Sequence, residues 1–219
     1  MSKIRVQSQG SKIRIKLHDD TQTPPQRGGG ETTPVEPTKT TPQDRKVLLL
    51  PARLIDLMEI RAESAFRPNE EDVELVYALS GSDPRKPDMI HKLSSRTVVE
   101  EASEEHIISS VEATMEHILK ERNGIPALIV DVHTHPESVP KPSDTDKQFF
   151  QTAAAKIAIK APHATVLFGV HAISSESIRE RQKPSKISRN TIRWSSITRE
   201  HEVGFFTPKA EPYEVEIID

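Results

Sequence analysis

The sequence predicts an α/β fold in which helices cover a β-sheet. Short apolar runs of the kind that form strands alternate along the chain with three longer segments whose apolar residues recur at helical spacing. The succession of predicted strands and helices contains no internal repeat. At 219 residues the chain is long enough for one domain with a core of its own, together with appendages.

The first 45 residues are predicted to lie outside the globular domain. Residues 1–19 alternate basic and apolar side chains, as a two-stranded ribbon or a mobile tail would. Residues 20–45 are rich in Pro, Thr, Gln and Gly, with almost no large apolar group, so we expect a disordered linker. Three alternatives remain open for the basic segment: it is a mobile tail, it adds a strand to a sheet edge or to a partner, or it contacts nucleic acid.

A single domain is predicted over residues 46–219. In its first part, apolar runs and helical spacing predict a strand at 47–50, a helix at 51–66 and strands at 74–81, 89–93 and 96–99. The strand at 74–81 begins with an acid, Glu74, which is unusual for a mostly apolar run.

The second part of the domain begins with the clearest amphipathic helix of the chain. The predicted elements are helices at 103–122 and 143–160, strands at 125–132, 165–171, 191–197 and 213–218, and a flexible polar loop at 174–188. Ser143 has the character of an N-cap, which places Asp146 at the third helical position.

Three metal-binding side chains follow the predicted strand at 125–132. His133 and His135 are two residues apart, so on one extended strand their side chains leave from the same face. Asp146 adds an anionic ligand from the first turn of the next helix. Two histidines and one carboxylate leave a position for water, which is the composition of a catalytic zinc site.

This ligand set predicts hydrolysis of an acyl bond. A divalent ion would lower the pKa of bound water toward ~7 and would polarise a carbonyl group. Glu74 is the candidate to carry the proton from the water to the leaving amine, since burial on an apolar strand raises the pKa of a carboxyl group. Ser143 could hydrogen-bond either an oxyanion or a ligand.

These residues resemble the JAMM metalloproteases, also called the MPN-plus family. The pattern of that family is a glutamate on an early strand, then H-x-H-P, six residues and S-x-x-D. Here it reads His133-Thr134-His135-Pro136, the six residues from Glu137 to Pro142, and Ser143-Asp144-Thr145-Asp146. Glu74 lies seven residues before Gly81, as the family glutamate precedes the glycine that ends its strand.

The resemblance implies an α/β/α sandwich around a mixed central sheet, in a layout like that of cytidine deaminases, with one catalytic zinc ion. It makes His133, His135 and Asp146 the ligands, Glu74 the acid/base and Ser143 the stabiliser on the oxyanion side. The implied reaction is cleavage of an isopeptide or peptide bond after the C-terminus of a ubiquitin-like protein. Because the segments that would grip polyubiquitin are short, a prokaryotic ubiquitin-like modifier or a sulfur carrier suits the chain better.

Two other functions remain as alternatives. The first is a non-catalytic MPN scaffold that binds protein partners, although such scaffolds characteristically lose ligands. The second is an iron(II) oxygenase, because two histidines and one carboxylate do not determine which metal binds. Such an oxygenase would need a β-barrel, and the long amphipathic helices predicted here argue against that fold.

Composition narrows the cellular setting. The formal net charge is -3, from 30 basic and 33 acidic residues, so no bulk field recruits nucleic acid or acidic membranes. Cysteine is absent, which excludes disulfides and thiolate ligands. The N-terminus lacks the apolar core of a signal peptide, and no run approaches the ~18 residues of a membrane span. A cytoplasmic protein is expected, and a homodimer is left open.

Four further side chains are predicted to be structural. His106 and His117 lie on one face of the helix at 103–122 and are expected at a solvated surface. His171 is expected to be a hydrogen-bonded histidine at the end of a strand, and Trp194 to pack in the core or on a sheet face.

Overall fold

The computed structural model describes residues 46–64, 74–96, 104–136, 139–174 and 180–219. The chain divides into two units, residues 1–40 and 41–219, and all of the described residues belong to the second. The predictions for the basic segment and the linker therefore lie outside the described residues. Within the described residues, no helix is long and apolar enough to cross a membrane.

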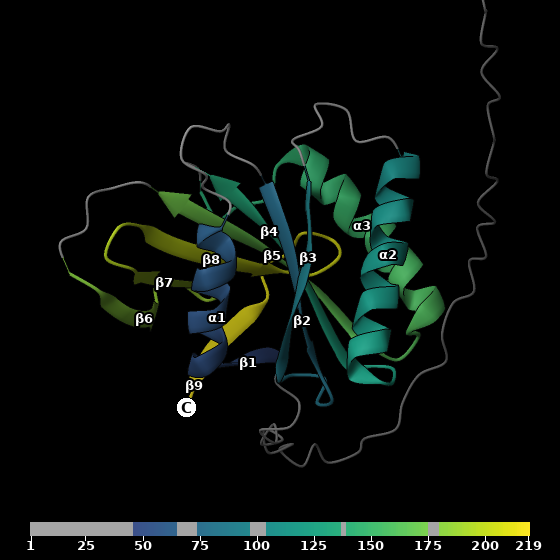
Figure 1. The fold of residues 1–219 in the computed structure, drawn as a ribbon, viewed down its shortest axis with the longest axis horizontal. Coiled ribbons are helices and arrows are strands. Elements are labelled where there is room, and N and C mark those ends of the chain that lie inside the picture. The colour runs from purple at the N-terminus through teal and green to yellow at the C-terminus, as the bar shows by residue number, and fades with distance from the viewer. Residues whose placement is uncertain (1–45, 65–73, 97–103, 137–138, 175–179) are drawn as a thin grey trace, which may run out of the picture. The chain divides into compact units, whose positions relative to one another are not determined.

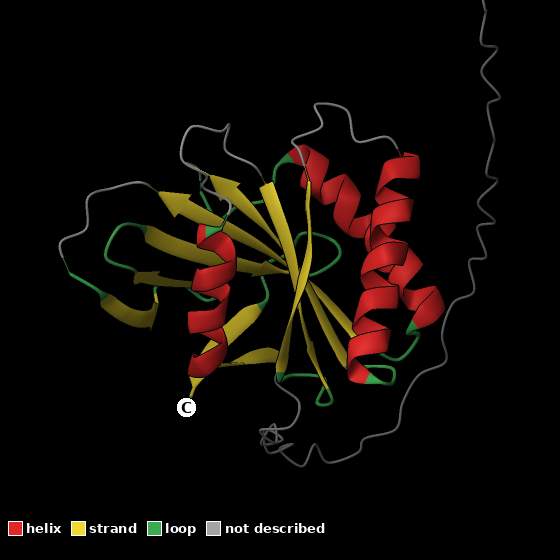
Figure 2. Ribbon diagram, viewed as in Figure 1, coloured by secondary structure: helices red, strands yellow, loops and turns green. Residues whose placement is uncertain are grey.

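The described chain alternates strands and helices, as the sequence predicts (Figures 1 and 2). The elements are β1 (Val47–Pro51), α1 (Ala52–Glu63), β2 (Glu74–Gly81), β3 (Met89–Arg96), α2 (Glu104–Arg122), β4 (Leu128–Pro136), α3 (Asp144–Lys160), β5 (Thr165–Ser174), β6 (Gln182–Lys186), β7 (Thr191–Ser195), β8 (Glu200–Phe206) and β9 (Glu214–Ile218).

The strands form a mixed sheet of seven and a separate pair. The large sheet has the order β3-β2-β4-β5-β8-β7-β6, and β1 pairs with β9 in parallel. In the large sheet β4 and β5 are parallel, while the other neighbouring strands are antiparallel. This arrangement confirms the predicted mixed central sheet.

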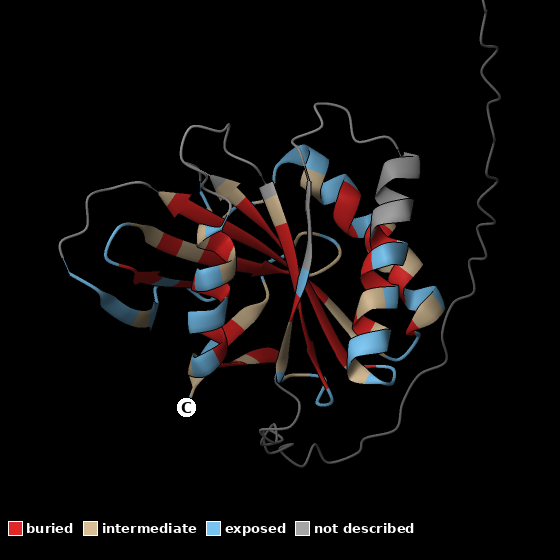
Figure 3. Ribbon diagram, in the orientation of Figure 1, coloured by how far each residue is buried: buried red, intermediate tan, exposed pale blue. Residues whose placement is uncertain are grey.

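Helices cover both faces of the large sheet, because alternate residues of its central strands are apolar on each side. Val130 and Val132 of β4 belong to a core with α1, whose buried Leu54, Ile55 and Met58 face them. Ile129, which directly precedes Val130 and so points to the other face, belongs to a second core with α2 and α3. Figure 3 shows the buried residues of the strands between these two layers of helices. The predicted α/β/α sandwich is therefore confirmed.

Three local predictions differ from the structure. The predicted loop at 174–188 contains β6, an exposed edge strand of sequence QKPSK that pairs with β7. Strand β8 was not predicted, since charged residues and Gly204 interrupt its apolar pattern. The predicted strands at 89–93 and 96–99 are one strand, β3, as far as Arg96; residues 97–99 lie outside the described part.

Candidate metal centre

Strand β4 carries both histidines at its C-terminal end, between two neighbours. Val76 of β2 pairs with His133, and His135 pairs with Ala172 of β5. His133 and His135 have the same parity along β4 as Ile129, so they leave from the face that α2 and α3 cover. A strand held on both sides therefore presents two imidazoles to one point.

Helix α3 presents the third side chain from its first turn. Ser143 is the N-cap, and its hydroxyl oxygen accepts a hydrogen bond from the Asp146 backbone N–H at 3.1 Å. In return, the backbone N–H and the hydroxyl of Ser143 both donate to Asp146 Oδ2 at 2.7 Å. The predicted N-cap is confirmed, and this capping box fixes the Asp146 carboxylate.

The three side chains bring their ligand atoms together. The Nε2 atoms of His133 and His135 lie 3.0 Å apart. Asp146 Oδ1 lies 3.1 Å from His133 Nε2, and Asp146 Oδ2 lies 3.4 Å from His135 Nε2. A tetrahedral zinc ion with bonds of about 2.0–2.1 Å places its ligand atoms about 3.3 Å apart. The three residues therefore fit a shared divalent ion and could hold one.

The electrostatics of the cluster favour a cation. Burial raises the pKa of Asp146, but hydrogen bonds from His133, His135 and Ser143 outweigh burial and hold the pKa well below its ordinary value of 3.8. The carboxylate is therefore ionised at neutral pH. The three side chains are 9–15% exposed, so the centre is mostly screened from solvent.

Aromatic packing holds the inner histidine. Phe150 lies one helical turn after Asp146 on α3, and its ring centroid is 6.1 Å from that of His133. Phe150 is fully buried and stacks on Phe168 of β5, with centroids 4.3 Å apart. The same helix thus supplies one candidate ligand and packs against another.

Thr134, between the two histidines, faces the opposite side of the sheet and anchors the start of β2. Its hydroxyl oxygen accepts a hydrogen bond of 2.8 Å from the Leu75 backbone N–H. Glu74 is the first residue of β2 and comes directly before Leu75; its side chain lies outside the described part of the structure. Since Val76 pairs with His133 in antiparallel register, position 74 falls at the level of His135. The backbone therefore brings the predicted acid/base to the strand end that carries the histidines.

A close approach of backbone supports the loop that leads to α3. A Cβ atom added to Gly204 of β8 would lie 2.4 Å from the carbonyl oxygen of Pro140, three residues before Ser143. Only a residue without a side chain lets the loop lie on β8 at this distance. Neither Thr134 nor Gly204 was predicted to support the site, because their contacts join segments far apart in the sequence.

His171 and Trp194 lie elsewhere, in a buried polar network on the α1 side of the sheet. His171 is fully buried and hydrogen-bonds with Tyr77 at 2.8 Å and with His201 at 3.1 Å. Trp194 is 2% exposed, and its Nε1–H donates to Glu59 at 2.9 Å. The prediction that Trp194 packs in the core is confirmed. His171 is hydrogen-bonded as predicted, but it lies within β5 rather than at the end of the strand.

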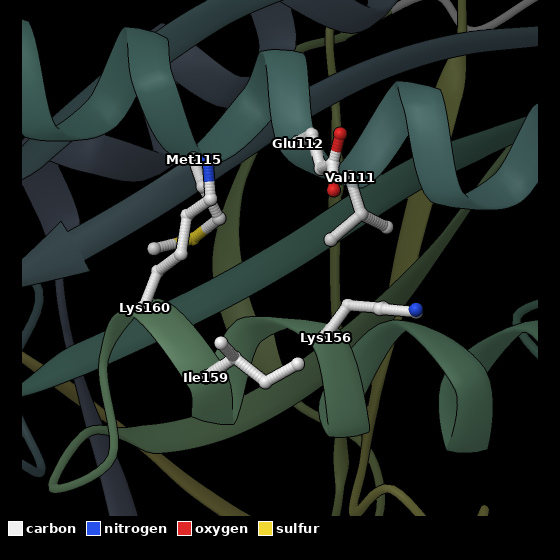
Figure 4. A pocket seen from close by; sticks show the side chains of 6 residues that line it. All are labelled: Val111, Glu112, Met115, Lys156, Ile159 and Lys160. Atoms are coloured by element: carbon white, nitrogen blue, oxygen red, sulfur yellow. The ribbon is translucent and has the colours of Figure 1, made fainter.

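A shallow pocket between α2 and α3 is separate from the three ligands. Figure 4 shows that apolar and charged side chains line it from both helices, namely Val111, Glu112, Met115, Lys156, Ile159 and Lys160. It shares no residue with the cluster of His133, His135 and Asp146.

Comparison with known proteins identifies the family. A family model described as prokaryotic homologs of the JAB domain matches residues 60–183. The matched segment runs from α1 into β6 and contains Glu74, both histidines and Asp146. No curated protein matches the chain. The match covers more than half of the sequence, and the chain therefore belongs to the family of prokaryotic homologs of the JAB domain.

Proposed function

We propose that this chain is a zinc-dependent isopeptidase or peptidase that hydrolyses the bond after the C-terminus of a ubiquitin-like modifier or a sulfur-carrier protein. The observation that carries the proposal is the convergence of His133, His135 and Asp146 at distances that fit one ion. Three protein ligands leave a fourth position open, as in catalytic zinc sites. Membership in the JAB family supports the reaction class, because that family includes metalloisopeptidases.

The metal would supply the reactive chemistry, and the protein would hold the metal and its ligands in place. When bound, zinc supplies a water of lowered pKa and a Lewis acid for the scissile carbonyl. Strand β4 fixes the two imidazoles between β2 and β5, and the capping box fixes Asp146. This rigidity keeps the reacting groups in place without reorganisation during the reaction.

Glu74 is the proposed acid/base. Its carboxylate would take a proton from the attacking water and pass it to the leaving amine. Its position at the start of β2 is fixed by the bond between the Leu75 N–H and Thr134. Ser143 has a different proposed role: its hydroxyl donates to Asp146, so it first orients a ligand, and it would have to turn to reach an oxyanion.

The test is cleavage of a fluorogenic amide placed at the C-terminus of a ubiquitin-like protein, and of the same amide on a sulfur carrier. A chelator should abolish cleavage and added zinc should restore it. Glu74→Gln should retain bound zinc and lose turnover by a factor of ~100 to 10,000, because it removes general acid-base catalysis. Glu216→Gln changes an exposed glutamate of β9 and serves as the matched control.

The outcomes separate the parts of the proposal. Replacing His133 and His135 with alanine should remove one equivalent of zinc and all turnover. Full activity in Glu74→Gln would show that another group carries the proton. Tight binding of the modifier without cleavage, with zinc in place, would instead identify the chain as a non-catalytic scaffold.

A further inference from the structure

A second group of metal-binding side chains joins α2 to the edge strand β3. His91 of β3 is fully buried, and its Nδ1 lies 2.5 Å from Oε2 of Glu121 near the end of α2. His117, one turn earlier on α2, places its Nε2 3.3 Å from Oε1 of the same carboxylate. The ligand atoms of the three residues all lie within 4.8 Å of one another. His117 was predicted to lie at a solvated surface, and its side chain is 39% exposed, but its pairing with Glu121 was not predicted.

The group has the layout of a metal site that is open on one side. His91 is closed off from solvent, while the side chains of His117 and Glu121 are 39% and 43% exposed. Water can therefore complete the coordination from the outer side. The 3.3 Å between His117 and Glu121 equals the spacing of two ligands on a tetrahedral zinc ion, about 3.3 Å. The shorter distance to His91 would have to open by less than about 1 Å, which the exposed Glu121 side chain permits.

A hydrogen bond behind His91 orients its ring. Nε2 of His91 lies 2.7 Å from the hydroxyl oxygen of Ser80, which is fully buried. With a metal at Nδ1, the Nε2–H would donate to this oxygen, the kind of contact that fixes the tautomer of histidine ligands. Arg122 also donates to Ser80, but its charge is paired with Asp88 at 2.6 Å. The positive charge of Arg122 is therefore already compensated by Asp88.

We propose that His91, His117 and Glu121 form a second site for a divalent transition metal, which ties α2 to β3. Two imidazoles and one carboxylate are the ligand types that zinc accepts. The site shares no ligand with the centre of His133, His135 and Asp146, so it does not depend on the proposed function. Its role is to brace the edge of the sheet, where β3 has a strand partner, β2, on one side.

Zinc is the probe, and the background is a variant without the first centre. The apoprotein of H133A/H135A should bind one zinc per chain after equilibration and gel filtration, whereas the wild-type chain should bind two. Zinc at about 100 times its dissociation constant should raise the Tm of H133A/H135A by about 5 °C or more. Adding His117→Ala should abolish both the bound zinc and the shift.

His163→Ala is the matched control, because His163 is an exposed histidine outside both groups. In the same background it should leave the bound zinc and the Tm shift unchanged. If H133A/H135A does not fold, His117→Ala alone should lower the wild-type content from two zinc ions to one without changing turnover. The proposal is overturned if H133A/H135A folds and binds no zinc, or if its zinc survives His117→Ala; the group is then a hydrogen-bonded clamp between α2 and β3.

Discussion

Thr134→Val isolates the bond that fixes the start of β2. Valine keeps the shape and volume of the fully buried threonine but removes the hydroxyl group. The Leu75 N–H, which donates to that oxygen at 2.8 Å, then loses its acceptor in a partly buried position. A donor left without a partner in this way costs about 1–2 kcal/mol of unfolding free energy, equivalent to a Tm lower by about 2–8 °C.

The consequence for activity is larger than that for stability. Glu74 adjoins Leu75, so release of the strand start misplaces the proposed acid/base, and a displacement of about 1 Å costs up to roughly 100-fold in rate. We expect the loss in kcat rather than in KM. Thr134→Ser keeps the hydroxyl group and loses only a methyl group, so it should lower the free energy of unfolding while kcat stays unchanged.

Amide hydrogen exchange at Leu75 measures the bond directly. Protection should fall in Thr134→Val and persist in Thr134→Ser, since only the second retains an acceptor. The reasoning is refuted if the Leu75 amide is equally protected in both variants, or if Thr134→Val turns over substrate as fast as Thr134→Ser.

Three other perturbations test the supports of the fold and the centre. Burial lowers the pKa of the His201 imidazole to about 4, below its ordinary 6.5. The stability that the neutral imidazole gives the folded protein is therefore complete above pH 6.5 and is lost as the pH falls to 4. Urea unfolding over this pH range should show that acid lowers the unfolding free energy by roughly 3 kcal/mol more in the wild type than in His201→Gln. Phe150→Ala should lower the unfolding free energy by about 3–5 kcal/mol and weaken zinc binding, because it removes the ring beside His133; unchanged affinity would mean that α3 needs no packing there. Gly204→Ala should displace the Pro140 loop and raise the zinc dissociation constant, measured by competition with a chelator, and equal affinity would show that the loop yields without moving Asp146.

Local sequence signals predicted much of the fold and the three candidate ligands that the structure brings together. The cap at Ser143 was predictable because its partner, Asp146, is three residues away and belongs to the same turn. That both histidines leave from one face of β4 followed from the two-residue period of a strand. Both signals depend on neighbours in the sequence, so no knowledge of the tertiary structure was needed.

Long-range pairing explains what the sequence did not reveal. Strand β6 is polar and contains Pro184, and its extended form comes from pairing with β7 rather than from its own residues. His91 carries no local sign of a role, because Glu121 lies thirty residues further along on a helix. Such contacts appear only when the sheet brings distant segments together.

The parallel pair of β1 and β9 constrains how the chain folds during synthesis. Val47 pairs with Glu214, so β1 gains β9, its strand partner among the described residues, only when nearly the whole domain has left the ribosome. Closing so long a loop is entropically costly and slow. Leu48 and Leu50, fully buried in the finished domain, lack the cover of β9 until then, and while they are exposed on the nascent chain they are natural contacts for a chaperone.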